Sequence, residues 1–479
     1  MEKKSTISKK TRKIILGICI AAAIVAVAGL SGYTYMADHN TLGRKISVCG
    51  VDVSRLDAKQ AEKKISTEFA NRPVSFQENG REIYSITLKA LGYSLNEEDL
   101  LNKLTDLQKQ REESRKIFPK KENINLECQI EEDEEQEKQS LDLSNFGKEE
   151  RKSSTDASIQ YNKEKKEFIL VKQIQGTKID PDKLQTTVDT NLNAAFDTSL
   201  LGDAIIVPVD KHVYVSPTVT ATEDMKNKVE DLNDQLRKYR SSTVTYTFGN
   251  ETVVLDSDTI TSWLKAEGET LTLDEEAIRT YISDLANKYN TIYIPRTFHT
   301  SKGTDVTIEG NEYGYRIDQD GEYAQLLEDL KSGTAVTREP VYSKKGYQRN
   351  GTDDLAGSYI EVSLDAQHLW LYKDGNLVTE TDIVSGKPVK GRETYRGAWP
   401  IAYKASPFNL TSNEYGYDVK VNYWMPFVYG QGLHDASWQS SFGGNRYKTH
   451  GSHGCINLPK DQAALIYNTI DAGYPIIIY

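Results

Sequence analysis

The stretch YIEVSLDAQHLWLYKDGNLVTETDIVSG, Tyr359 to Gly386, alternates apolar and polar side chains on both sides of the dipeptide Asp374-Gly375. Alternation with a period of two is typical of half-buried strands, and Asp-Gly between two such runs indicates a tight hairpin turn. We therefore expect this stretch to form a β-hairpin and to begin a domain rich in strands.

The sequence after this hairpin supports the same fold class. Further strands are expected around residues 399–403 and 419–427, and the final residues, YPIIIY, have the pattern of a buried strand. A helix is expected to open after Pro459 and to end near Ile470; its predicted inner face consists of Ala463, Ala464, Tyr467 and Ile470. Residues 357–479 are therefore predicted to form a mostly β, sandwich-like domain with one or two helices.

The loop before this helix, THGSHGCINLP, concentrates reactive side chains. His434, His450 and His453 all precede Cys455 within a short span. A zinc site, a catalytic thiol and a surface loop that happens to hold histidines would each explain the cluster. A structural zinc site is disfavoured because such sites use paired cysteine or histidine spacings, whereas this cluster has a single cysteine.

A catalytic thiol makes fuller use of these residues. A thiol with its ordinary pKa is only slightly ionised near neutral pH, so it needs a neighbouring base. His434 lies on a separate segment and suits the role of that base. Gly454 permits a tight turn, so the N–H groups of His453, Gly454 and Cys455 are expected to converge as an oxyanion hole. The hydroxyl of Ser452 is a further candidate donor.

The segments HDASW, from His434, and SHGCINLP, from Ser452, closely resemble the L,D-transpeptidase catalytic domain family (YkuD-type). Members carry a histidine, a spacer, Ser/Thr-His-Gly-Cys, a hydrophobic residue and a polar residue, and the resemblance extends over residues 357–479. It implies catalytic roles for Cys455, His434 and His453, and oxyanion or supporting roles for Ser452 and Gly454. It implies neither a metal nor any other cofactor.

The resemblance also implies a reaction. Cys455 would attack the carbonyl of the third residue of a peptidoglycan tetrapeptide stem, release the terminal D-alanine and pass the acyl group to an amine of a neighbouring stem, forming a 3-3 cross-link. It leads us to expect acylation by carbapenems as well. An L,D-carboxypeptidase, which transfers the same acyl group to water, and a wall-binding anchor with little activity remain alternatives. A sortase is disfavoured because no arginine follows Cys455.

Aromatic residues near the motif are candidates for binding the substrate. Tyr423, Trp424 and Trp438, together with Asn457, form this set, and core packing is the alternative role for the aromatic members. One departure from the family pattern is visible: TYRGAWPI has Tyr395 and Arg396 where members commonly have proline and a variable residue. Substrate preference is expected to depend on this loop.

The region before the catalytic domain contains a weak internal repeat. In both copies a hairpin is followed by a Gly-x-x-Ile-Asp step into a helix, with Asp180 and Asp318 placed to cap that helix. The copies resemble the peptidoglycan-binding domains that precede such catalytic domains. The predicted division is a cytoplasmic tail (1–13), a transmembrane anchor (14–36), a first α+β repeat with an acidic insertion (45–215), a second α+β repeat (216–345) and the catalytic domain (357–479).

The N-terminal sequence predicts a membrane anchor. A basic tail precedes the uncharged run Ile14 to Met36, which is long enough to span a bilayer, so an N-in, C-out anchor is predicted. A cleaved signal peptide is the alternative.

The chain has 59 Lys and Arg against 70 Asp and Glu, which gives a formal charge of −11. This acidic balance argues against nucleic acid as a partner.

The sequence predicts no chemical role for two further features. Cys49 and Cys128 are interpreted as unpaired structural thiols, with a disulfide between them as the alternative. The acidic run from Glu127 to Ser154 is interpreted as a solvated, mobile loop or an exposed helix.

Overall fold

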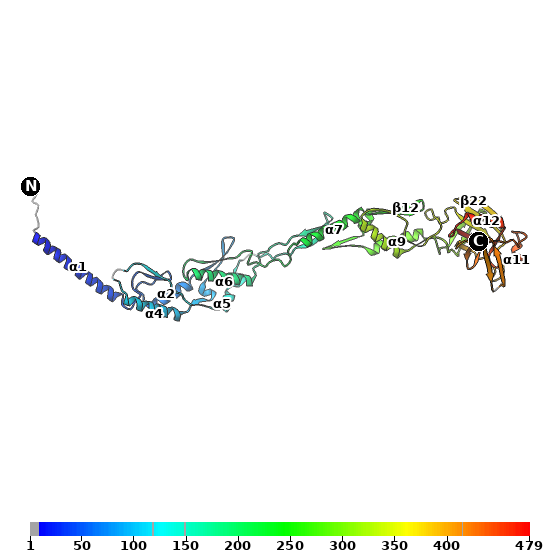
Figure 1. Cartoon of the computed structure of the whole chain (residues 1–479). Coiled ribbons are helices and arrows are strands. Elements are labelled where there is room, and N and C mark those ends of the chain that lie inside the picture. Colours follow the sequence, from blue (N-terminus) through cyan, green and yellow to red (C-terminus); the bar gives the residue numbers. More distant parts are fainter. Residues whose placement is uncertain (1–8, 117–118, 148–149, 414) are drawn as a thin grey trace, which may run out of the picture. The chain divides into compact units, whose positions relative to one another are not determined.

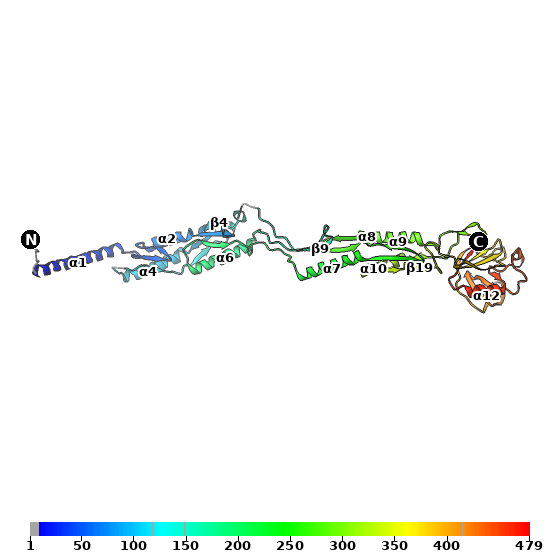
Figure 2. The same ribbon diagram turned by 90° about the horizontal axis from the view of Figure 1, so that it is seen from above.

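The computed structural model describes residues 9–116, 119–147, 150–413 and 415–479, and the chain is drawn in two views in Figures 1 and 2. The first half of the predicted cytoplasmic tail, residues 1–8, lies outside this range. The described chain divides into two compact units. Unit 1 consists of residues 1–158 and 171–221, and unit 2 consists of residues 159–170 and 222–479. Each unit is described separately.

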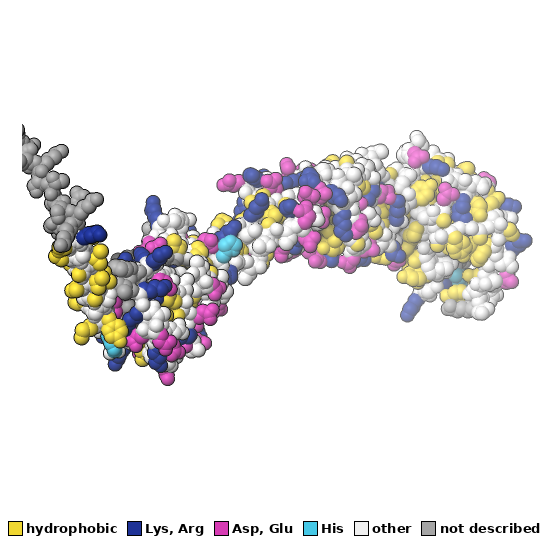
Figure 3. Space-filling view, turned by 60° about the vertical axis from the view of Figure 1, so that its left-hand side comes forward, with side chains coloured by type: hydrophobic (Ala, Val, Ile, Leu, Met, Phe, Trp, Pro, Cys, Tyr) yellow, Lys and Arg dark blue, Asp and Glu magenta, His cyan; other side chains and the backbone are white. Residues whose placement is uncertain are grey.

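Unit 1 begins with one long apolar helix, α1 (Lys9–Ala37). Its segment Leu16–Tyr33 has a mean hydropathy of 2.1 and is long enough to cross a membrane. The hydrophobic side chains of this segment are exposed, and Figure 3 shows them as a hydrophobic run beside the grey N-terminal residues. Exposure of such a surface is costly in water, which is consistent with a membrane span or a signal sequence.

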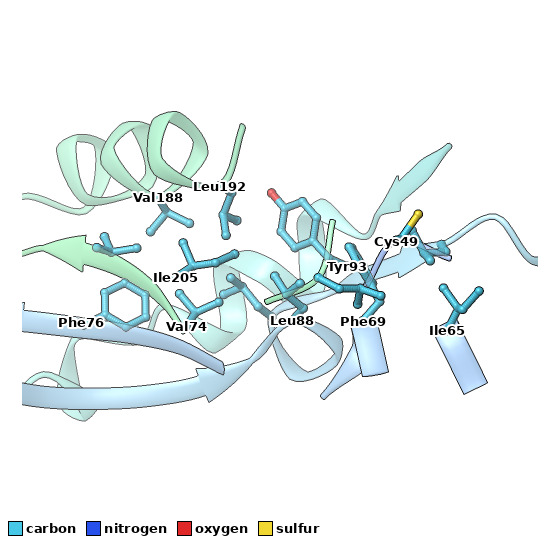
Figure 4. Close-up of a cluster of buried hydrophobic side chains, with 14 of the residues drawn as sticks. Cys49, Ile65, Phe69, Val74, Phe76, Leu88, Tyr93, Val188, Leu192 and Ile205 are labelled. Atoms are coloured by element: carbon cyan, nitrogen blue, oxygen red, sulfur yellow. The ribbon is translucent and has the colours of Figure 1, made fainter. Parts of the chain in front are cut away.

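The core of unit 1 is a three-stranded sheet in the order β10-β3-β4, with β10 parallel to β3 and β4 antiparallel to it. Helices pack against it through apolar side chains, among them Val188 and Leu192 against Val74 and Ile205 (Figure 4). The elements of this fold are α2 (Ala58–Ala70), β3 (Pro73–Glu78), β4 (Arg81–Thr87), α3 (Leu88–Leu91), β5 (Tyr93–Leu95), α4 (Glu97–Glu113), α6 (Pro181–Thr198) and β10 (Ile205–Pro208).

The described part of the acidic insertion packs on this fold, and it contains an exposed helix, which was one of the two forms expected for it. It contains β7 (Ile130–Glu132), which pairs with β5, α5 (Glu134–Ser140) and a short 3₁₀ turn, η1 (Leu143–Asn145). Glu137 is buried and accepts a hydrogen bond of 3.1 Å from the hydroxyl of Tyr93. The other described acidic side chains of the run are exposed, whereas this one carboxyl has a buried partner.

Strands β1 and β2 follow α1 closely in the sequence and pair with the more distant strand β6. Strand β1 pairs in parallel with β6 and antiparallel with β2, giving a second small sheet. The bounds of these strands are β1 (Ile46–Val48), β2 (Val51–Asp52) and β6 (Glu122–Ile124).

Unit 2 repeats the topology of the unit 1 sheet. Its first sheet has the order β18-β11-β12, again with one parallel and one antiparallel neighbour of the central strand. Asp180 and Asp318 cap the corresponding helices α6 and α10 through their side chains, as predicted. The elements are α7 (Glu223–Ser241), β11 (Thr243–Phe248), β12 (Glu251–Leu255), α8 (Ser257–Ser262), β13 (Leu264–Glu267), β14 (Thr270–Leu273), α9 (Glu275–Tyr289), β17 (Arg316–Ile317), α10 (Gln319–Ser332), β18 (Ala335–Arg338) and β19 (Tyr342–Lys344).

Both hairpins of the repeat lie in unit 2. The hairpin of β8 (Ser158–Asn162) and β9 (Glu167–Val171) packs Ile159 and Phe168 against α7. The hairpin of β15 (Arg296–His299) and β16 (Asp305–Ile308) packs Phe298 and Ile308 against the C-terminal domain. The first hairpin therefore contributes to the core around α7, and the second contributes to the core of the C-terminal domain.

The second hairpin is fastened to the C-terminal domain by buried polar groups as well. The carboxylate of Glu361 is fully buried and accepts hydrogen bonds from the backbone N–H and the hydroxyl of Ser301 and from the hydroxyl of Tyr479. Arg296 donates two hydrogen bonds, of 2.9 and 2.8 Å, to the carboxylate of Asp354. Buried carboxylates are stable only with such partners, so these contacts specify one docking geometry.

The C-terminal domain is mostly β, as predicted. Its main sheet has the order β22-β21-β20-β29-β23, and a second sheet has the order β26-β27-β28. Asp374 and Gly375 both have positive φ, as a tight hairpin turn requires. The elements are β20 (Tyr359–Ser363), β21 (His368–Lys373), β22 (Asn376–Asp382), β23 (Gly397–Pro400), β24 (Phe408–Ser412), β25 (Tyr417–Val421), β26 (Trp424–Val428), β27 (Gln431–Asp435), α11 (Arg446–His450), β28 (Ile456–Leu458), α12 (Lys460–Thr469) and β29 (Pro475–Ile478).

Two details differ from the expectation. The strand predicted over 419–427 is divided into β25 and β26, because the carboxylate of Asp435 accepts hydrogen bonds from the backbone N–H groups of Asn422 and Tyr423. In α12, Ile466 is buried and Ala464 only half-buried, so the inner face is rotated slightly from the predicted one.

Candidate active site

The predicted nucleophile lies in the loop between α11 and β28. Gly454, immediately before Cys455, has φ +118°, a conformation that side chains other than hydrogen rarely adopt. A Cβ at this position would also lie 2.2 Å from Nε2 of Gln431. Glycine is therefore required for two independent reasons, and the loop can present Cys455 only with this residue before it.

The hydroxyl of Ser452 bridges the same loop. It accepts a hydrogen bond of 3.0 Å from the N–H of Gly454 and donates one of 2.5 Å to the carbonyl oxygen of Cys455. The Gly454 N–H and the Ser452 hydroxyl were both expected to serve an oxyanion hole. In this structure their hydrogen-bonding capacity is used within the loop, so both residues support its shape instead.

The loop is also fastened from outside. The hydroxyl of Thr394 donates a hydrogen bond of 2.8 Å to the carbonyl of Gly454 and accepts one of 2.9 Å from the N–H of Gly386. The next residue, Tyr395, donates its N–H to the side-chain oxygen of Gln431, and its ring makes an edge contact with Tyr429. The loop that departs from the family pattern is thus linked directly to the nucleophile loop.

His434 lies on β27, in register with Asn457 of the parallel strand β28 that follows Cys455. It is 3% exposed, and its Nδ1 lies 2.9 Å from the carbonyl oxygen of Asp435. Burial lowers the pKa of His434, although the carbonyl and the carboxylate of Asp435 oppose the shift. A neutral ring that donates from Nδ1 to this carbonyl keeps Nε2 as a proton acceptor, which is what a general base needs.

Cys455 is half-buried, and its environment favours the protonated thiol. Burial raises the pKa of Cys455 to about 11, and a hydrogen bond from the backbone N–H of Gly432 opposes this shift. The sulfur lies 3.9 Å from the carbonyl oxygen of Gly430. Within the described part of the chain, no hydrogen bond joins this thiol to His434. Such bonds are often long before substrate binds, so the geometry is that of a resting site.

A pocket of about 330 Å³ contains both residues. Its walls come from the β24–β25 hairpin, the segment after β27, α11 and the nucleophile loop; the lining residues are Leu410, Tyr417, Val419, His434, Trp438, Gln439, Arg446, His450, Gly451, Ser452, His453, Cys455 and Asn457. The pocket therefore brings together Cys455, His434 and His453, the three residues with predicted catalytic roles.

His453 is placed differently from His434. Its ring stacks on Tyr415 and Tyr417 of the β24–β25 hairpin, with centroid distances of 4.2 and 5.5 Å. These contacts hold the imidazole against the hairpin that forms one wall of the pocket.

The predicted substrate-binding residues separate into two groups. Trp438, which is half exposed, and Asn457 line the pocket, and Oδ1 of Asn457 is buried without a hydrogen-bond partner. Trp424 and Tyr423 do not line it. The Trp424 ring is buried between Phe408 and His434, and Tyr423 packs on Tyr467.

Sequence reasoning missed the hairpin residues Leu410, Tyr417 and Val419, together with Gln439 and Arg446. The alternation in FNLTS and YDVKV, on either side of an Asn-Glu-Tyr-Gly turn, was the signal for this hairpin. Arg446 donates to the side chain of Gln439, which in turn donates to the carbonyl of His450. Among the described residues, no three His, Cys, Asp or Glu side chains gather in a way that could hold a metal ion.

The chain matches two family models. Residues 357–478 match the "L,D-transpeptidase catalytic domain" (YkuD), and residues 225–338 match the "Putative peptidoglycan binding domain". No curated protein matches the chain.

Solved structures of Enterococcus faecium L,D-transpeptidase are similar to the chain. A crystal structure of a cysteine-to-serine mutant is 35% identical, and the match covers 51% of this chain and 98% of that one, with a TM-score of 0.44. The catalytic domain acylated by ertapenem, solved by NMR, is 41% identical over 26% of this chain and 97% of that one, with a TM-score of 0.23. The chain therefore belongs to the L,D-transpeptidase family, with a YkuD-type catalytic domain at 357–478 preceded by a peptidoglycan-binding domain at 225–338.

Proposed function

We propose that the protein is a peptidoglycan L,D-transpeptidase that forms 3-3 cross-links through an acyl-enzyme on Cys455. The observation that carries the proposal is the shared pocket of Cys455 and His434, in which the Asp435 carbonyl orients the imidazole. Peptidoglycan as the substrate is supported by the two matched domains.

In the first half-reaction His434 accepts the thiol proton as the sulfur attacks the carbonyl of the third stem residue. The buried, neutral imidazole suits this role, because a thiol with a raised pKa needs a base in the transition state. His434 then protonates the leaving D-alanine amine. The thioester keeps the energy of the broken peptide bond available, so no nucleotide is needed for the next bond.

In the second half-reaction an amine of a neighbouring stem attacks the thioester, and His434 removes its proton. Among groups near the developing oxyanion, the N–H of Cys455 is the candidate donor, since the N–H of Gly454 is bonded to Ser452. Oδ1 of Asn457, buried and without a partner on the pocket wall, is a candidate acceptor for a substrate N–H. Trp438 is a candidate wall for the stem.

The test is mass spectrometry of the products formed by the purified protein from muropeptides with tetrapeptide stems and a suitable amine acceptor. The expected main product is the 3-3 dimer. Positioning of the amine must outcompete water at about 55 M, which a shaped site can achieve. Excess hydrolysed tripeptide at saturating acceptor would instead assign an L,D-carboxypeptidase, and no turnover at all would assign a wall-binding anchor.

Cys455→Ala is the matched control for this experiment. It is expected to abolish both acylation and turnover and to leave the thermal unfolding midpoint nearly unchanged. Activity is expected to survive chelating agents; a loss that added zinc restores would favour a metal-dependent site. The Enterococcus faecium domain is acylated by ertapenem; acylation by a carbapenem should likewise add the mass of the drug to the protein with Cys455 and not to the variant.

We propose further that α1 is an uncleaved anchor, with the catalytic domain on the wall-facing side of the membrane. The proposal is supported by the apolar segment Leu16–Tyr33 and by the basic residues that precede it. Protease added to intact protoplasts should digest residues beyond about 40, since the span ends there. Protection of that region would contradict this topology. The segment 45–215, whose sheet topology equals that of the matched domain, is proposed to bind the wall as well.

A further inference from the structure

Two cysteines of unit 1 that have no part in the proposed reaction lie next to each other. Cys49 directly follows β1 and donates its N–H to the carbonyl of Ile124, at the end of β6. Cys128 lies between β6 and β7. The parallel pairing of β1 with β6 therefore brings together residues that are far apart in the sequence.

The two thiols share the same surroundings. The Cys49 sulfur lies 3.5 Å from the carbonyl oxygen of Leu126, and the Cys128 sulfur lies 3.6 Å from the same oxygen. The N–H of Leu126 points to the Cys49 sulfur at 3.4 Å. Both sulfurs therefore contact the same carbonyl oxygen. Two sulfurs that contact one oxygen lie near each other, so modest movements can bring them to the geometry of a disulfide.

The environment makes one of the sulfurs a nucleophile and leaves the other accessible. The neighbouring Cys128 thiol and the N–H of Leu126 lower the pKa of Cys49 to about 6, against the effect of burial. Cys49 is 7% exposed, whereas Cys128 is half-buried. The contact with Cys49 raises the pKa of Cys128, while Lys103 nearby acts in the opposite direction. A solvent reagent therefore meets Cys128 first, with the Cys49 sulfur behind it.

We infer that Cys49 and Cys128 are a redox-modification site, at which a small disulfide compound oxidises the pair to an intramolecular disulfide. In the first exchange the Cys128 thiol gives up its proton as its sulfur attacks one sulfur of the compound, whose other half leaves as a thiolate and takes up that proton. In the second exchange the Cys49 thiolate attacks the Cys128 sulfur and expels the remaining half. The protein loses two electrons and two protons, and the compound is reduced to two thiols.

The new bond would join the end of β1 to the segment between β6 and β7, closing a loop that contains α2, β3, β4, β5 and α4. A crosslink across a long loop removes conformational freedom from the unfolded chain. In the oxidised form, the part of unit 1 that follows α1 should thus be more stable against unfolding. The catalytic pocket makes no contribution to this effect.

The test uses the full chain in detergent, with Cys19→Ser and Cys455→Ala so that only the pair remains. After incubation with hydroxyethyl disulfide, acid quenching, denaturation and reaction with N-ethylmaleimide, intact mass should show no alkylated thiol and a loss of about two mass units, as two hydrogens leave. Peptide mapping should recover a peptide linking Cys49 to Cys128. The thermal midpoint of unit 1 should rise by roughly 5–10 °C.

Two single variants in the same background separate the roles of the sulfurs. With Cys49→Ser, the mixed disulfide on Cys128 should persist because no second thiol resolves it. With Cys128→Ser, the buried Cys49 should form little mixed disulfide, and neither variant should show the rise in thermal midpoint. Two alkylatable thiols after oxidation, a retained mixed disulfide in the two-cysteine protein, or crosslinked dimers in its place would each overturn the inference.

Discussion

The hydroxyl of Thr394 donates a hydrogen bond to the carbonyl oxygen of Gly454, so a side chain from the loop before β23 holds the backbone immediately before Cys455, the proposed nucleophile. Thr394→Val preserves the shape of the side chain but removes this bond and the acceptor for Gly386. We expect kcat to fall by about tenfold with little change in KM, because the loss concerns positioning of Cys455.

Thr394→Ser is the matched control, since it keeps the hydroxyl and should restore most of the rate. Steady-state kinetics with a tetrapeptide donor, alongside thermal unfolding of each variant, provides the measurement. Equal kinetics for the valine and serine variants would show that this hydrogen bond does not contribute to the rate.

The state of the resting thiol predicts how its reactivity depends on pH. Because burial raises the pKa of Cys455 to about 11, its alkylation by iodoacetamide should accelerate about tenfold per pH unit from pH 7 to about 10. The labelling rate at the Cys455 peptide, followed by mass spectrometry beside a free model thiol, measures this. A stable thiolate–imidazolium pair would instead give a rate that is already constant near neutral pH, so a plateau there would contradict the structure.

Two of the three histidines that line the pocket, His434 and His450, should differ in importance. His434→Ala removes the buried base and should lower the acylation rate by about 10²- to 10⁴-fold. His450 is exposed at the end of α11 and is hydrogen-bonded to Thr449 through Nδ1. Its replacement by alanine should lower the acylation rate by less than about tenfold. Stopped-flow acylation by a carbapenem measures both. Similar, small losses at the two positions would exclude His434 from general-base catalysis.

The buried carboxyl of Glu137 should make the stability of unit 1 depend on pH. Burial raises the pKa of Glu137 from 4.5 to about 7, so the folded state holds a proton that the unfolded state has already released. This contribution is complete below about pH 4.5 and is lost as the pH rises through about 7. We expect a decrease of about 1–3 kcal/mol in the opening free energy between pH 5 and pH 8.

Hydrogen exchange of the peptides covering α5 and β5, measured at several pH values, reports this opening. Glu137→Gln keeps the side-chain oxygen that accepts from Tyr93 and should flatten the dependence. Glu135→Gln, on the exposed face of the same helix, should leave it unchanged. A flat profile for the unmodified protein would show that the carboxyl is ionised in the folded state.

Much of the C-terminal domain could be predicted because its signals are local. The hairpin turn at Asp374-Gly375 needs only two residues with positive φ. In the preceding repeats, the aspartate caps of α6 and α10 likewise need only the residues beside them. The division of the predicted 419–427 strand depends instead on Asp435, which reaches back across the sheet to bind two N–H groups. No local pattern around residue 422 indicates that contact.

The same distinction applies to the pocket. Cys455 and His434 follow from a motif, whereas the bond between the Gly454 N–H and the Ser452 hydroxyl depends on the folded shape of the loop. Glu137 is a comparable case, since nothing in a run of acidic residues distinguishes the one carboxyl that faces Tyr93. Sequence patterns thus predicted the residue types at the site better than they predicted which hydrogen-bonding groups remain available there.

The docking of the β15–β16 hairpin through Glu361 and Phe298 bears on how such proteins can be recombined. A chimaera joined near residue 357 would contain Cys455 but would lack Ser301, which donates hydrogen bonds to the buried carboxylate of Glu361. It would also lack Phe298, whose ring packs on Tyr359 and Tyr479. A joint placed just before Arg296 would carry the hairpin along with the enzyme. The segment that must be transferred together is therefore longer than the matched catalytic domain, residues 357–478. Junctions that evolution or protein engineering tolerates should lie upstream of that hairpin.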